Sequence, residues 1–167
     1  PNTVAGAVRS TLELNPAILN VHAQGGPAMM QAAGAALDGA DGEKPLLIAV
    51  TVLTSLGDDD LEAIGVNDGA ENQVVRLAKL TQTCGLGGVV CSPREIKAIR
   101  TACGPDFKLV VPGIRPEWAA AGDQKRITTP AQAIRDGADY IVIGRPITGA
   151  DNPVDAAKRI ADELAGL

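Results

Sequence analysis

The chain has 167 residues, enough for one domain with a sizeable core, and apolar residues make up 46% of it. Its net charge of −5 comes without a block of lysine or arginine, which argues against nucleic-acid binding. The longest apolar run, residues 45–53, is far too short to cross a membrane.

Five short segments rich in Val, Ile and Leu are predicted to be β-strands. Apolar and polar residues do not alternate in them, which is typical of strands buried on both faces of a parallel sheet. The five segments are residues 18–23, 45–53, 87–91, 107–111 and 140–143. The low aromatic content of 2% fits a core of small aliphatic side chains packed between a sheet and helices.

Helices are predicted before the first strand and between the strands. Ser92 and Glu95 have the spacing of a capping box, and Thr129 and Asn152 each precede a proline at a predicted helix start. Other helices are predicted over residues 27–37 and 71–84, and a short helix is predicted to begin with the three acidic residues 58–60. The regular alternation of strand and helix predicts one α/β domain with a parallel sheet, over residues 1–167.

Two architectures fit this pattern, a doubly wound sheet closed by five strands and a (β/α)8 TIM barrel. The last two predicted strands are each followed by glycine and arginine, at Gly113 and Arg115 and again at Gly144 and Arg145. In barrels, the loops after strands seven and eight often form a phosphate site. We therefore predict strands 4–8 of a barrel, and we expect three further βα units ahead of Pro1.

The cysteine and histidine content bears on the cellular compartment and on metal binding. The three cysteines are an odd number without C-x-x-C spacing, which is typical of reduced thiols in a cytoplasmic protein. One histidine and no Cys/His cluster leave little from which to build a transition-metal site.

Seven segments, in order and at the expected spacing, resemble bacterial orotidine 5′-phosphate decarboxylases. They are PNT (1–3), NVHAQGG (20–26), LIAVTVLTS (47–55), GVVCS (88–92), PGIRP (112–116), GDQKR (122–126) and IGRPI (143–147). The resemblance implies a TIM barrel that works as a homodimer without cofactor or metal. It also implies removal of CO2 from orotidine monophosphate to give UMP, the last step of pyrimidine nucleotide synthesis.

The resemblance also implies roles for particular residues. Arg145 and the backbone of Gly144 would hold the 5′-phosphate, and Arg115 would be a second contact on the phosphate side. Gln124, on a polar loop that has the small residues of a mobile flap, would bridge the phosphate and the pyrimidine. Thr54 would meet the pyrimidine ring.

The catalytic residues of the resembled family are not expected within this chain. Its proton-donor lysine and carboxylates include a D-x-K-x-x-D-I segment directly before P-N-T, and we therefore expect them upstream of Pro1. Thr3 would belong to a substrate-contacting segment that reaches toward the neighbouring subunit's substrate. No lysine of the chain is predicted at the carboxyl end of a strand.

Two other functions stay open. One is a related barrel enzyme, a sugar-phosphate decarboxylase or synthase, although VTVLTS and Gln124 argue against it. The other is a nucleotide-binding fragment without catalytic activity.

Overall fold

The computed structural model describes residues 1–39, 42–119 and 128–167. The strands are β1 (Ile18–His22), β2 (Leu46–Val50), β3 (Gly88–Val90), β4 (Lys108–Val111) and β5 (Tyr140–Ile141). The α-helices are α1 (Asn2–Leu12), α2 (Pro27–Ala36), α3 (Asp58–Ala63), α4 (Ala70–Thr83), α5 (Ile96–Cys103), α6 (Pro130–Asp136), α7 (Arg145–Thr148) and α8 (Pro153–Ala165). Four 3-10 turns are η1 (Ala23–Gly25), η2 (Leu37–Gly39), η3 (Pro93–Glu95) and η4 (Glu117–Ala119).

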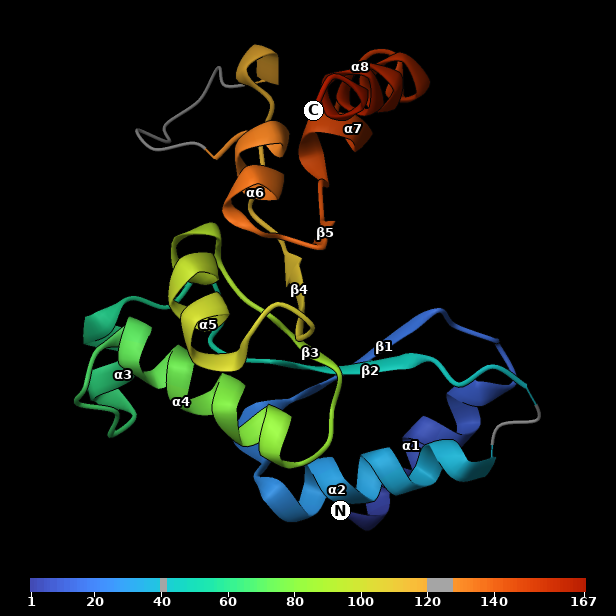
Figure 1. Cartoon of the computed structure of the whole chain (residues 1–167), viewed down its shortest axis with the longest axis vertical. Helices are drawn as coiled ribbons and strands as arrows, with labels where there is room; N and C mark the ends of the chain where they lie inside the picture. The colour runs from blue at the N-terminus through green and yellow to red at the C-terminus, as the bar shows by residue number, and fades with distance from the viewer. Residues whose placement is uncertain (40–41, 120–127) are drawn as a thin grey trace.

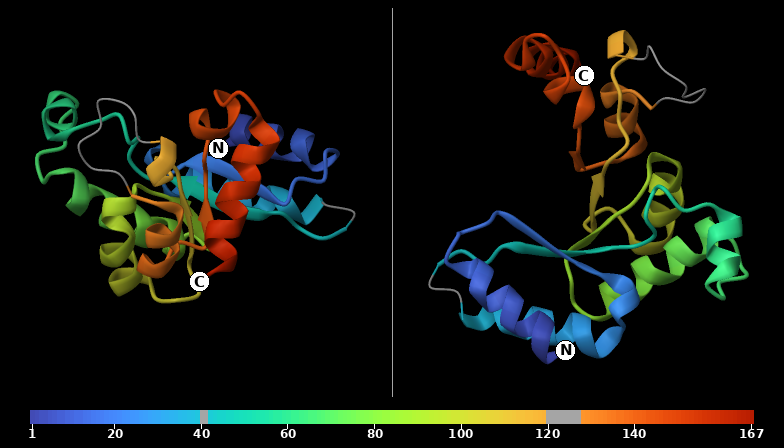
Figure 2. Two further views of the ribbon diagram at one scale, coloured as in Figure 1. Left: turned by 90° about the horizontal axis from the view of Figure 1, so that it is seen from above. Right: turned by 180° about the vertical axis from the view of Figure 1, so that it is seen from behind.

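All five predicted strands are present and pair in parallel, in the order β1-β2-β3-β4-β5. A doubly wound sheet reverses its strand order at a switch point, whereas the wall of a barrel adds each strand beside the previous one. The sequential order confirms the barrel-type prediction over the doubly wound one. The sheet turns between its two ends, with α1 and α2 at the β1 end and α6, α7 and α8 at the β5 end (Figures 1 and 2).

One face of the sheet packs against the helices and forms the core. The register places Leu47, Val89 and Leu109 on this face, and all three side chains are buried. They belong to one apolar cluster with side chains from the helices, among them Ala33, Leu77 and Ile99. Parallel strands are joined by crossover connections, here helices, and these helices cover this face of the sheet. The alternation of strand and helix in the sequence follows from this arrangement.

The opposite face of the sheet is covered less completely. Val110 is paired in register with Tyr140, and Tyr140 is 45% exposed while Val142, two residues on, is 49% exposed. At the other end of the sheet, Asn20 and His22 of β1 are also exposed on this face. Within the described residues, the outer edges of β1 and β5 pair with no other strand.

The predicted helix starts are confirmed in detail. The backbone N–H of Ser92 donates to the Glu95 carboxylate at 2.8 Å, which is half of a capping box. The Thr129 hydroxyl accepts from the N–H of Gln132, and the Asn152 side chain accepts from the N–H groups that open α8. At the end of α5, Gly104 takes a φ of 85°, which non-glycine residues seldom adopt.

The three cysteines, Cys84, Cys91 and Cys103, are free thiols. Burial raises the pKa of the Cys91 thiol to about 12, with a smaller contribution from the nearby Glu95 carboxylate. Such a thiol is protonated at neutral pH and therefore a poor nucleophile and metal ligand. In the part of the chain that the structure describes, no helix is both long and apolar enough to cross a membrane.

Candidate functional site

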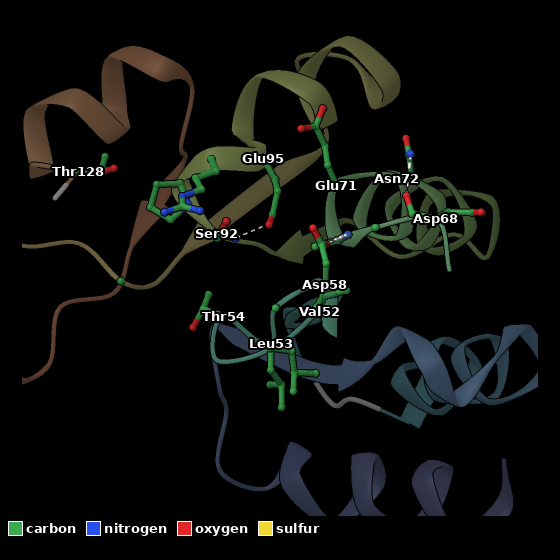
Figure 3. A pocket seen from close by; sticks show the side chains of 17 residues that line it. Val52, Leu53, Thr54, Asp58, Asp68, Glu71, Asn72, Ser92, Glu95 and Thr128 are labelled. Carbon is green, nitrogen blue, oxygen red and sulfur yellow. Dashed lines mark hydrogen bonds between the residues drawn. The ribbon is translucent and has the colours of Figure 1, made fainter. Parts of the chain in front are cut away.

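A cavity of about 870 Å³ opens at the carboxyl ends of β2, β3 and β4 (Figure 3). Its walls come from the segments after these strands and from the start of α4. The lining residues include Val52, Leu53, Thr54, Asp58, Asp68, Glu71, Asn72, Ser92, Arg94, Glu95, Gly113 and Thr128. In parallel α/β proteins, ligands bind at this edge of the sheet, and the cavity therefore marks the candidate site.

Thr54, for which the family resemblance implies a pyrimidine contact, forms part of one wall. It lies in the segment that leaves β2, and its side chain is exposed on the cavity side opposite Ser92 and Glu95 (Figure 3). Just before it, Thr51 is buried, and its hydroxyl donates to the Val90 carbonyl oxygen at 2.8 Å. This bond continues the β2–β3 pairing and fixes the point from which the Thr54 segment departs.

Glu95 lines the cavity, and the pKa of its carboxyl group is shifted from the ordinary value. Burial raises the pKa of Glu95, and the nearby Glu71 carboxylate raises it further, while its hydrogen bonds to Ser92 oppose the shift. The Ser92 bond fixes the Glu95 side chain at the start of α5. In this geometry the Glu95 carboxylate primarily caps the helical segment that begins at Pro93 and continues into α5.

A second wall is acidic and comes from the α3–α4 region. The Asp58 carboxylate accepts from the backbone N–H of Ala70 at 2.8 Å and so joins the start of α3 to the start of α4. Asp68 is paired with Arg76, which lies within α4. Sequence reasoning did not place these acids in the site, because only the folding of α3 back onto α4 brings them to the cavity.

Arg115 lies beside this cavity but is not among its lining residues. Its neighbours Gly113 and Thr128 both line the wall. The backbone N–H of Arg115 donates to the Thr128 carbonyl oxygen at 3.1 Å, and the buried Ile114 forms a parallel bridge with Thr128. The two sides of the loop after β4 are thus joined at its root, where Arg115 is half-buried.

The other predicted site residues lie outside the cavity lining. Gly144 is the N-cap of α7, three residues after the end of β5, and Arg145 opens that helix; both are exposed. A Cβ at Gly144 would meet no atom of the described residues within 4 Å, so its backbone is open on that side. Thr3 is exposed in the first turn of α1. Gln124 lies outside the described residues.

The sequential parallel sheet and the cavity at its carboxyl edge are typical of α/β barrel enzymes, whose sites lie at the carboxyl ends of the strands. The chain belongs to the orotidine 5′-phosphate decarboxylase / HUMPS family, whose sequence pattern matches residues 1–160. It is 56% identical to orotidine 5′-phosphate decarboxylase of Rhodospirillum rubrum, with 99% of the chain and 69% of that protein covered. It is 53% identical to the enzyme of Trichlorobacter lovleyi, with 98% and 69% covered.

Solved structures give the same relationship. The crystal structure of orotidine 5′-phosphate decarboxylase from Lactobacillus acidophilus matches with a TM-score of 0.86 and 38% identity, over 98% of this chain and 70% of that one. The enzyme from Pyrococcus horikoshii matches with a TM-score of 0.74 and 26% identity, over 100% of this chain and 70% of that one. The fold class predicted from the sequence, an α/β TIM barrel, is confirmed by these matches.

Proposed function

We propose that the chain provides the nucleotide-binding part of an orotidine 5′-phosphate decarboxylase, which converts orotidine monophosphate to UMP and CO2 in pyrimidine biosynthesis. The identity of 53–56% to enzymes of that name, over nearly the whole chain, carries this proposal. The family description also covers a second group, HUMPS, which keeps the sugar-phosphate alternative within the same fold. The level of identity to the decarboxylases favours the first function.

The residues at the carboxyl edge suit a substrate with two anionic ends, a phosphate and a carboxylate. Arg145, the Gly144 backbone and Arg115 are proposed to hold the phosphate, since a guanidinium pairs with phosphate through two parallel hydrogen bonds. Thr54 is proposed to contact the pyrimidine, and Gln124 to bridge the two parts. Binding energy at the remote phosphate can then hold the reacting carboxylate in a less favourable, water-excluded environment.

The proton donor is proposed to come from a part of the enzyme outside residues 1–167. Lys44 precedes β2, Lys108 opens β4 at the amino edge of the sheet, and Lys79, Lys97 and Lys158 lie within helices. None of these described lysines can therefore reach a reacting carbon at the carboxyl edge. We further propose that the enzyme is a cytoplasmic homodimer. In this dimer, Thr3 reaches toward the substrate of the neighbouring subunit.

Release of labelled CO2 from orotidine monophosphate tests the function. The chain is compared with a longer version that carries the family's D-x-K-x-x-D-I segment directly ahead of Pro1. We expect both to bind UMP and only the longer version to release CO2. Turnover of a hexulose or gulonate phosphate by the longer version, without release from orotidine monophosphate, would reassign the activity.

Arg145→Ala should weaken UMP binding by at least about 1.5 kcal/mol, the low end for a hydrogen bond to a charged group. Isothermal titration calorimetry gives the difference directly. Arg135→Ala is the matched control, because Arg135 is exposed in the last turn of α6 and should leave the affinity unchanged. An Arg145→Ala protein with normal UMP affinity would remove this residue from the phosphate site.

A further inference from the structure

Helix α8 contacts both sides of the loop that follows β4. The guanidinium of Arg159 lies over the ring of Trp118, with 4.2 Å between its central carbon and the ring centroid. One helical turn further on, the Glu163 carboxylate accepts from the backbone N–H of Ala131 at 3.0 Å. Residues four apart share one helix face, so a single face of α8 holds both points.

The two points bracket the root of the loop that carries Arg115. Trp118 lies in η4, three residues after Arg115, and Ala131 lies three residues after Thr128. The bridge between Ile114 and Thr128 and the bond from the Arg115 N–H to Thr128 join the two sides. The backbone at Arg115 is therefore held by this bridge, and α8 contacts the segments that flank the bridge on both sides.

The same helix also packs against the second proposed phosphate contact. Helix α8 is in contact with α7, whose first residue is Arg145, and with α6 (Figure 1). Arg115 and Arg145 come from the ends of neighbouring strands, β4 and β5. The segments that carry these two arginines are thus connected both by the β4–β5 pairing and through α8.

We infer that Arg159 and Glu163 are positioning residues for phosphate binding: they fix the loop of Arg115 relative to Arg145 without touching the ligand. This inference rests on the proposed nucleotide-binding function. A guanidinium over an indole face is a favourable contact that holds both groups in one orientation. Two cations that must meet one phosphate bind it best when their spacing is already set, because no ordering is then needed on binding.

The test separates positioning of the phosphate contacts from general stability. UMP and uridine share base and ribose and differ by the phosphate, so their dissociation constants are compared by titration calorimetry for UMP and by NMR titration for uridine. We expect Arg159→Gln to weaken UMP binding about twofold to fivefold, the effect of losing a cation–π contact at an exposed site, and to leave uridine unchanged. Arg159→Lys should recover most of the UMP affinity, because an ammonium also binds over an indole face.

Lys158→Gln is the matched control, since Lys158 is the exposed neighbour on the same helix and should not change either affinity. Glu163→Ala is the second variant, and it should reproduce the selective loss. Equal weakening of UMP and uridine, or no change in either, in both Arg159→Gln and Glu163→Ala would overturn the inference. An unaltered protein that binds no UMP would contradict the proposed function, and this inference with it.

Discussion

Gly88→Ala is expected to lower the free energy of unfolding by at least about 3 kcal/mol, the upper part of the usual range for overpacking. Gly88 lies in β3, is buried, and pairs in register with Lys108 of β4. A Cβ at this position would overlap the Lys108 carbonyl oxygen and come within 2.8 Å of the Lys108 Cβ. A urea unfolding curve measures the change.

The size of this effect follows from which atoms would have to move. A flexible side chain can rotate away from a new methyl group, but the carbonyl of Lys108 belongs to the β3–β4 ladder. Moving it stretches the hydrogen bonds on both sides of β4, including the one from the Lys108 N–H to the Gly87 oxygen at 2.9 Å. The strain therefore affects the β3–β4 pair, which is flanked by β2 on one side and β5 on the other.

Gly34→Ala is the matched control for the same chemical change. Gly34 lies within α2, and a Cβ there would meet no atom within 4 Å. Alanine should stabilise the helix by about 0.5–1 kcal/mol, because glycine loses more backbone freedom on folding. A Gly88→Ala protein as stable as the Gly34→Ala protein would show that β4 can move aside freely.

The elements were predictable from the sequence because each carries its own local signal. Buried parallel strands have no polar face, and the caps at Ser92, Thr129 and Asn152 need only residues within three positions. The order of the strands in the sheet is a long-range property, and only the paired Gly–Arg strand ends indicated it. The resemblance then supplied what spacing could not, the roles that we propose for Thr54 and Arg145.

The parts of the site that the sequence did not reveal depend on contacts between distant segments. Asp58 reads as an acid at a helix start, but it lines the cavity because its carboxylate holds the N–H of Ala70, twelve residues away. The position of Arg115 depends on the pairing of Ile114 with Thr128. Neither pairing has a local sequence pattern, because a hydrogen bond to a backbone group leaves no constraint on the partner's residue type.

Arg100→Met should lower the free energy of unfolding by about 2 kcal/mol or more, because it removes one of the two cationic partners of the partly buried Asp139 carboxylate. Arg100 lies on α5 at the amino edge of the sheet, and its side chain is 20% exposed. It pairs with Asp139 and donates to the carbonyl oxygens of Gly137 at 2.6 Å and Pro105 at 3.1 Å. These carbonyls belong to the loops before β5 and β4, so one guanidinium joins α5 to both loops.

Arg76→Met is the control, because it removes the same group from an exposed pair. The side chains of Arg76 and Asp68 are 56% and 60% exposed. Exposed ion pairs contribute about 0–1 kcal/mol, since water and salt screen the attraction. Chemical denaturation of both variants compares the two, and equal losses would contradict a special role for Arg100.

Acid should reveal the same network through Asp139. Burial alone raises the pKa of Asp139, but hydrogen bonds from the Leu109 N–H, Lys108 and Arg100 outweigh it, and the pKa is lowered. The unfolded chain then takes up the proton first, so the stabilisation is complete above about pH 4 and is lost as the pH falls through the lowered pKa. Arg100→Met removes one of the groups that lower it, so stability should fall less steeply with acid below pH 4 than in the unaltered protein. Parallel pH profiles for the two proteins would mean that Lys108 and the Leu109 N–H suffice to hold the carboxylate.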